Sequence, residues 1–322
     1  MTNGGNILAL SGGVGGAKLA LGLSNVVSPR QLTIVANTGD DFQYLGMHIS
    51  PDIDSLLYAL AGVNNQDTGW GRESESWTFM SELERLGIES WFRLGDHDLA
   101  VHVYRTSRLK AGQPLSIVTR DLSRRFGVAS NIVPMSDDCI STMVETGAGC
   151  LSFQDYFVRH GCQPVVTRIF FENAGDSRPS TEFTEALEDP ELAGIVICPS
   201  NPYLSIDPIL SVPGVAKAIA GSNAPVVAVT PIVQGRSVKG PTAKIMEELG
   251  FAVSALSVAE HYRSLIDGFV LDAVDEPIAQ AVSGLGMDVE VTNTVMQTLD
   301  DRNALASRVV ELLQRLRKAD LQ

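Results

Sequence analysis

Short apolar segments alternate with segments of helical periodicity along most of the chain. The apolar runs are short and largely uninterrupted, as in strands buried on both faces, and they lie at 6–10, 32–36, 165–170, 194–198, 226–230, 268–271 and 289–292. Helical patterns lie at 17–23, 53–60, 76–86, 242–249, 277–283 and 300–317. This alternation predicts an α/β fold with a mostly parallel sheet.

The stretch 51–161 has a different pattern. It holds few runs typical of buried strands and several helical ones, including 98–108 and 114–126. We therefore predict a largely helical insertion at about 51–161, packed against the carboxyl edge of the sheet, where ligands bind in open α/β folds. The 322 residues contain no long linker. They are expected to form a single elaborated Rossmann-like domain, its sheet built from 1–50 and 162–322 and flanked by helices.

A glycine-rich loop follows the first predicted strand. Ser11 is followed by Gly12, Gly13, Gly15 and Gly16, and then a helical pattern begins. Such a loop can present backbone N–H groups to a phosphate. It is not a Walker A loop, because Ala17 separates Gly16 from Lys18, and Lys18 also breaks the dinucleotide fingerprint. A tight turn without a ligand is the alternative.

Three acidic pairs follow apolar segments, in Asn37–Asp41, His48–Asp54 and Trp91–Asp98. Carboxylates without a Cys or His cluster suit Mg²⁺, and a carboxylate can also act as a base toward a hydroxyl. Acidic residues at helix starts are the structural alternative. The candidate metal ligands are Asp40, Asp41, Asp52, Asp54 and Asp96, and the candidate catalytic residues are Asp54, Asp40 and Asp41.

Two later loops contain residues suited to a sugar, a base or a phosphate. The first follows the strand at 194–198 and carries Ser200, Asn201 and Ser205; an ordinary turn is its alternative. The second follows the strand at 226–230 and is expected to bind an anion, unless it is a solvated basic loop. Its candidate residues are Gly235, Arg236, Lys239 and Gly240.

Composition narrows the functional classes. The net charge of −14 argues against a nucleic-acid partner, so an anionic substrate must be held by local donors or by a metal. No run approaches the ~20 apolar residues of a membrane span, and no signal peptide is visible. The four cysteines show no metal-ligand spacing. We expect a cytoplasmic protein that acts on small molecules and has no membrane partner.

Six segments in order resemble the 2-phospho-L-lactate transferase family (CofD-like), which builds the deazaflavin coenzyme F-420. They are 11–18, 37–41, 48–54, 91–98, 199–205 and 230–241, and the sequences His-Ile-Ser-Pro-Asp-Ile-Asp and Trp-Phe-Arg-Leu-Gly-Asp-His-Asp are the most specific of them. The C-terminal third adds only a compatible α/β pattern.

The resemblance implies a reaction. A guanylylated phospho-acid gives its phospho-acid unit to a hydroxyl of the deazaflavin FO, GMP leaves, and Mg²⁺ is required. It also implies that Asp54 and Arg93 contact FO, that 199–205 and 235–240 hold the guanosine diphosphate end, and that the protein is a homodimer. Ser11–Gly16 would bind donor phosphate.

Two other functions remain open from the sequence. Regulatory proteins of the same fold superfamily bind a nucleotide sugar without turnover, and a generic nucleotide hydrolase is a third reading, although no water-activating group stands out. The donor acid is equally open among 2-phospho-L-lactate, phosphoenolpyruvate and 3-phosphoglycerate.

Overall fold

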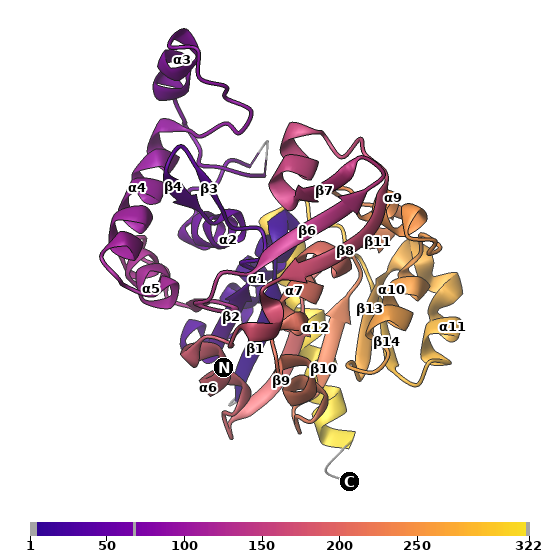
Figure 1. Ribbon diagram of the computed structural model, residues 1–322. Coiled ribbons are helices and arrows are strands. Elements are labelled where there is room, and N and C mark those ends of the chain that lie inside the picture. The colour runs from indigo at the N-terminus through magenta and orange to yellow at the C-terminus, as the bar shows by residue number, and fades with distance from the viewer. Residues whose placement is uncertain (1–4, 67–68, 320–322) are drawn as a thin grey trace.

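Seven parallel strands form the central sheet of the computed structural model, which describes residues 5–66 and 69–319 (Figure 1). Their order is β14-β13-β10-β9-β1-β2-β5, and every neighbouring pair is parallel. The strands span β1 (Asn6–Ser11), β2 (Leu32–Ala36), β5 (Asn131–Pro134), β9 (Leu192–Ile197), β10 (Val226–Val229), β13 (Gly268–Asp272) and β14 (Asp288–Thr292). The α/β, Rossmann-like prediction is confirmed.

Helices cover both faces of this sheet, so its strands carry apolar side chains in both directions. In β1, Leu8 and Leu10 enter one core while Ile7 and Ala9 enter the other. The second core is closed by α1 (Gly13–Val26), α2 (Pro51–Ala61), α5 (Leu115–Arg125) and α12 (Leu299–Ala319). The first is closed by α7 (Asp207–Ser211), α8 (Val215–Ala220), α9 (Thr242–Glu248), α10 (Ala255–Tyr262) and α11 (Ala279–Ser283).

A second sheet contains the strand predicted at 165–170. It is antiparallel, with the order β7-β6-β8, and consists of β6 (Ser141–Thr146), β7 (Gly149–Ser152) and β8 (Val166–Glu172). The strand prediction is therefore right but its place in the main sheet is wrong. Its pattern differs from that of the core strands, because only Val166 of β8 is buried.

The predicted helical insertion is only partly helical. It holds α2, α3 (Thr78–Arg85), α4 (Asp96–Lys110) and α5, but it also holds β6, β7 and β5, and β5 is the edge strand of the main sheet. The main sheet thus takes one strand from inside 51–161. This strand is four residues long and ends in Pro134, which an edge strand tolerates, so its pattern is weak.

The remaining elements are short. A hairpin of β3 (Phe42–Tyr44) and β4 (Met47–Ile49) packs with α3 and α4 around a small third core. A further hairpin joins β11 (Ile232–Val233) to β12 (Arg236–Ser237), and α6 (Thr181–Leu187) precedes β9. Short 3-10 or π-helical turns occupy Pro29–Gln31, Asp155–Arg159, Ala174–Asp176, Pro202–Ile206 and Ala273–Ile278. No helix of the described residues is long and apolar enough to cross a membrane.

Helices α1 and α12 approach closely at Gly22, since a Cβ placed there would lie 2.2 Å from the carbonyl oxygen of Arg302. We expect Gly22→Ala to lower the free energy of unfolding by about 1–3 kcal/mol through overpacking, despite the better helix propensity of alanine. Urea denaturation measures the change. The control is Gly147→Ala, whose added Cβ meets nothing within 4 Å. Equal stability of the two variants would contradict this packing.

Candidate functional site

The glycine loop packs tightly against the loop that follows β9. A Cβ on Gly15 would lie 2.4 Å from the carbonyl oxygen of Pro199, and one on Gly16 would lie 2.6 Å from Ser200 Oγ. The backbone N–H of Gly12 donates to Ser200 Oγ at 3.1 Å. The close approach of the two loops therefore accounts for the lack of a side chain at Gly15 and Gly16. The alternative of a tight turn without a ligand is consistent with this packing. The helix also begins at Gly13, four residues earlier than predicted.

The carboxylate of Asp52 joins three segments at the carboxyl edge of the sheet. On α2, its Oδ1 accepts a hydrogen bond from the Gly13 N–H at 2.7 Å. Its Oδ2 accepts one from Asn37 Nδ2 at 3.0 Å, just after β2. Asp52, from the second acidic segment, thus links the glycine loop to the residues that follow β2.

Asp40, Asp41 and Asp52 form one group, which we call the acidic cluster. Burial raises the pKa of Asp40 well above its usual value, and repulsion from Asp52 and Asp41 adds to the shift. Burial raises the pKa of Asp52 to about 6. Asp41 is held from one side only, where its Oδ2 accepts a hydrogen bond from Ser50 Oγ at 2.7 Å and lies 3.0 Å from His48 Nε2.

Several oxygens around the acidic cluster are buried without a hydrogen-bond partner. They include Oδ1 of Asp40, Oδ1 of Asp41, Oγ1 of Thr38 and Oγ of Ser11. Buried polar atoms are normally satisfied, so such a gathering is typical of a place that receives an ion or a ligand. All these donors are oxygens, which are the ligands that Mg²⁺ prefers. The unpartnered oxygens of the acidic cluster are thus of the type that Mg²⁺ takes as ligands, although Asp40, Asp41 and Asp52 do not together bring ligand atoms within 4.8 Å of one another.

Asp54 belongs to a different group. Its Oδ2 accepts a hydrogen bond from Arg105 Nη1 at 3.1 Å, and its Oδ1 pairs with Arg105 Nη2. His102 and Asp98 of α4 lie beside this pair, and Tyr58 donates to Asp98. Burial raises the pKa of Asp54, while the positive charge of Arg105 opposes that shift.

This second group has the ligand types of a metal site but not the electrostatics. Atoms of Asp54, Asp98 and His102 come within 4.8 Å of one another. Arg105 already places a positive charge against Asp54, however, and it contacts His102 Nδ1 at 3.3 Å. A second cation there would be repelled at close range. Asp54 is thus occupied by its ion pair with Arg105, whose charge also acts on Asp41 of the acidic cluster.

Asp96 caps a helix. Its carboxylate accepts hydrogen bonds from the N–H groups of Thr78 and Phe79 at the start of α3, and from Ser76 Oγ. Glu75 makes the reciprocal contact, accepting from the N–H groups at the start of α4. The helix-start alternative accounts for Asp96, and these bonds lower its pKa.

The aromatic residues near Arg93 pack mainly on one another. Tyr44, Trp91 and Phe92 form edge contacts, with ring centroids 5.3 to 5.9 Å apart. Arg93 is exposed and its guanidinium stands 4.5 Å from the centroid of the Trp77 ring. The structure thus places Arg93 beside Trp77, the residue that precedes α3.

Three cations gather on the other side of the glycine loop, and we call them the basic cluster: Lys18, Lys239 and Arg302. Burial lowers the pKa of Lys18, and repulsion from Arg302 and Lys239 lowers it further. A Cβ on Gly69 would lie 2.5 Å from Lys239 Nζ and 3.1 Å from Val14 Cγ1, so Lys239 reaches the loop. Lys18 Nζ also donates to the carbonyl oxygen of Met296 at 2.8 Å.

The two loops after β9 and β10 contribute differently. Ser200 and Ser205 lie against the glycine loop, and the Oδ1 of Asn201 caps the turn at Pro202–Ile206. Asn201 Nδ2 is buried without a partner. Gly235, Arg236 and Gly240 belong to the segment around the β11–β12 hairpin, where both glycines have positive φ.

Four functional candidates lie outside the predicted set. Asn37, Arg105, Lys18 and Arg302 each contact the groups above. Asn37 and Lys18 lie inside the predicted motifs, so the sequence could have identified them as candidates. Arg105 and Arg302 lie within helical patterns and had no such signal.

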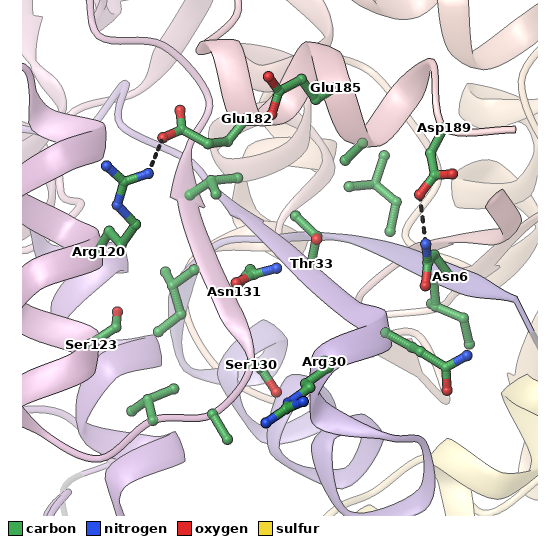
Figure 2. Close-up of a pocket in the computed structure, with 18 of the residues that line it drawn as sticks. Asn6, Arg30, Thr33, Arg120, Ser123, Ser130, Asn131, Glu182, Glu185 and Asp189 are labelled. Carbon is green, nitrogen blue, oxygen red and sulfur yellow. Dashed lines mark hydrogen bonds and ion pairs between the residues drawn. The ribbon is translucent and has the colours of Figure 1, made fainter. Parts of the chain in front are cut away.

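A groove of about 590 Å³ lies at the opposite edge of the sheet (Figure 2). It is lined by Asn6, Thr33 and Asn131, at or near the amino ends of β1, β2 and β5. Among its charged side chains, Arg120 pairs with Glu182, and Asp189 accepts a hydrogen bond from Asn6. Ligands of open α/β sheets bind at the carboxyl ends of strands, so the candidate site is the other edge.

The raised pKa of Asp52 predicts a pH dependence of stability in metal-free buffer. The pKa of Asp52 in the folded protein, about 6, exceeds its pKa in the unfolded chain. The contribution of Asp52 to the free energy of unfolding is therefore full below about pH 4 and is lost as pH rises toward 6. We expect Asp52→Asn to remove this loss. Between pH 4 and 7, wild type should lose up to about 3 kcal/mol relative to the variant in denaturant titrations.

The exposed Asp288→Asn serves as the control and should follow the wild type. Parallel pH profiles for the wild type and Asp52→Asn would contradict the raised pKa.

Comparisons with known proteins show which proteins the chain is similar to. The sequence model of the family described as 2-phospho-L-lactate transferase CofD matches residues 7–312. A phosphoenolpyruvate transferase of Streptomyces griseus is 37% identical over 317 residues, covering 97% of this chain and 99% of that protein. A 2-phospho-L-lactate transferase of Methanosarcina mazei is 36% identical over 305 residues, covering 95% and 99%.

A crystal structure of a protein member of the upf0052 family from Bacillus halodurans has the same fold. It superimposes with a TM-score of 0.62 at 17% identity, covering 96% of this chain and 100% of that chain. The likeness concerns the fold alone, whereas the family match spans nearly the whole sequence. The chain belongs to the CofD family of 2-phospho-L-lactate transferases.

Proposed function

We propose that this transferase moves a phospho-acid unit from a guanosine diphospho-acid to the hydroxyl of FO, releasing GMP, in the biosynthesis of coenzyme F-420. One observation carries the proposal: the acidic cluster and the basic cluster flank the same glycine loop. In a chain with a net charge of −14, the basic cluster offers local positive charge to an anionic diphosphate. Family membership supports the same reaction class.

The donor would lie along the glycine loop. Lys18, Lys239 and Arg302 supply charge for its diphosphate, and the loops at 199–205 and 235–240 are proposed to hold its guanosine end. Asp40 and Asp41 would hold Mg²⁺, with Asp52 beside them. When bound, Mg²⁺ neutralises negative charge on the phosphates and on the departing GMP.

Asp54 and Arg93 are proposed to bind the acceptor FO. In the transfer, the FO hydroxyl oxygen forms a new bond to the phosphorus that carries the acid. The bond from that phosphorus to the bridging oxygen breaks, GMP leaves with the electron pair, and the hydroxyl proton passes to water. The chain orients the two reactants for this displacement, which is the main protein contribution to phosphoryl transfer.

The donor is proposed to be a guanylylated three-carbon phospho-acid. Relatives of similar identity carry both the phosphoenolpyruvate and the 2-phospho-L-lactate names. Identity alone therefore does not choose between the acids, and the assay must include both, together with 3-phosphoglycerate.

Incubation of the protein with FO, Mg²⁺ and the three guanylylated acids tests the proposal. We expect GMP release and one dominant deazaflavin product by mass spectrometry. Absence of both products with every donor would overturn the function. Tight binding of a UDP-sugar without FO binding would favour the regulatory alternative, and GMP release that needs no FO would favour a hydrolase.

Replacement of Lys18 tests the donor side. Lys18→Met removes one charge from the basic cluster, and we expect the KM for the donor to rise by about ten- to a hundredfold, the range for a lost charged contact. The KM for FO should stay within about twofold of wild type, a change smaller than the ~1 kcal/mol that a typical hydrogen bond contributes.

Lys217→Met is the matched control, because Lys217 is an exposed lysine on α8 and the variant has the same net charge. Steady-state kinetics with each substrate varied in turn gives the values. An unchanged donor KM for Lys18→Met would remove the basic cluster from the donor site.

A further inference from the structure

Arg105 is a completely buried arginine whose guanidinium hydrogen-bonds to the carboxylate of Asp54, while its charge also acts on Asp41 and Asp98. Its exposed fraction is 0%, and that of Asp54 is 5%. The guanidinium contacts both oxygens of Asp54, Nη1 to Oδ2 at 3.1 Å and Nη2 to Oδ1. A bidentate contact of this kind fixes the plane of the carboxylate as well as its position. Burial of the pair is costly, so a fold that keeps it has few other ways to orient Asp54.

The pair is held from behind by three further side chains. His102 Nδ1 lies 3.3 Å from Arg105 Nη1, and His102 Nε2 lies 3.3 Å from Asp98 Oδ2. The hydroxyl of Tyr58 donates to the other oxygen of Asp98. Because the guanidinium can only donate, His102 Nδ1 is the acceptor in its contact with Arg105. Each member therefore restrains the next.

We propose that Arg105 is a positioning residue of the transfer reaction: through its bidentate contact it holds Asp54 in the one orientation that receives the acceptor. This inference rests on the proposed function, in which Asp54 binds FO. Arg105 has no exposed surface with which to touch a substrate, so it acts through Asp54 alone. Asp54 then meets the acceptor as a fixed hydrogen-bond acceptor, while the donor is bound by separate groups.

A graded pair of substitutions tests the positioning role. Arg105→Lys keeps the charge but loses the fork that contacts both oxygens, whereas Arg105→Met loses both. We expect FO affinity, measured by fluorescence titration, to fall by about tenfold in Arg105→Lys and by more in Arg105→Met. The KM for the donor should stay within about twofold. Wild-type FO affinity in Arg105→Lys, or an equal rise in both KM values, would overturn the proposal.

Two further variants separate positioning from stability. Arg308→Met is the control, because it also breaks an arginine contact to a buried carboxylate, that of Glu290, away from the site; it should leave FO affinity unchanged. If Arg105→Met does not fold, the double variant Asp54→Asn/Arg105→Met removes both charges. It should bind FO as weakly as Asp54→Asn, and recovery of wild-type affinity would overturn the role.

Failure of the proposed function is distinguishable from failure of this inference. A wild-type protein that neither binds FO nor releases GMP refutes the function. The crystal structure of Arg105→Lys then decides the positioning role: the Asp54 carboxylate should turn from its wild-type orientation, and an unchanged orientation would overturn it.

Discussion

The two hydrogen bonds accepted by Asp52 are the constraint on which the site depends. They tie the first turn of α1 and the end of β2 to the start of α2. These segments all lie at the carboxyl edge of the sheet, where the fold leaves loops rather than packed helices. The cost is electrostatic, since Asp52 is buried beside Asp40 and Asp41 and its pKa rises. The same crowding leaves carboxylate oxygens of Asp40 and Asp41 without partners, and the proposed cation site rests on these oxygens.

Negatively and positively charged side chains occupy different places around Asp52. Among the described residues, no guanidinium hydrogen-bonds to the acidic cluster, whereas Asp54 pairs with one that is fully buried. The basic cluster lies beyond the glycine loop. In a low-dielectric interior, charges at such separations interact more strongly than they would in water. A cation, an anionic donor and a neutral acceptor hydroxyl can thus be assigned to different parts of one edge without competing for the same side chains.

Most of the fold and part of the site could be predicted from the sequence. Uninterrupted apolar runs such as those of β9 and β13 are unambiguous, because both faces of the sheet are covered. β5 could not be recognised, because it is a four-residue edge strand ending in proline. The motifs located Asp40, Asp41 and Asp52, but nothing in the motif around Asp54 indicates its partner, since Arg105 lies 51 positions away.

The glycine-rich sequence of the first loop was the least reliable guide to the role of its residues. Gly15 and Gly16 suit a phosphate loop, yet their lack of a Cβ is already required by Pro199 and Ser200. Asp96 likewise fits a metal ligand by residue type and a helix cap by geometry. In both cases the deciding contact comes from a segment that is distant in sequence, which local pattern cannot reveal.

The most direct test of the account compares Asp40→Asn with Asp54→Asn in one kinetic experiment in which Mg²⁺ and FO are each varied. The account predicts that Asp40→Asn raises the Mg²⁺ concentration for half-maximal rate and leaves the KM for FO unchanged. It predicts the reverse for Asp54→Asn. A shift of the same parameter in both variants would contradict the division of the acidic residues into a cation site and an acceptor site.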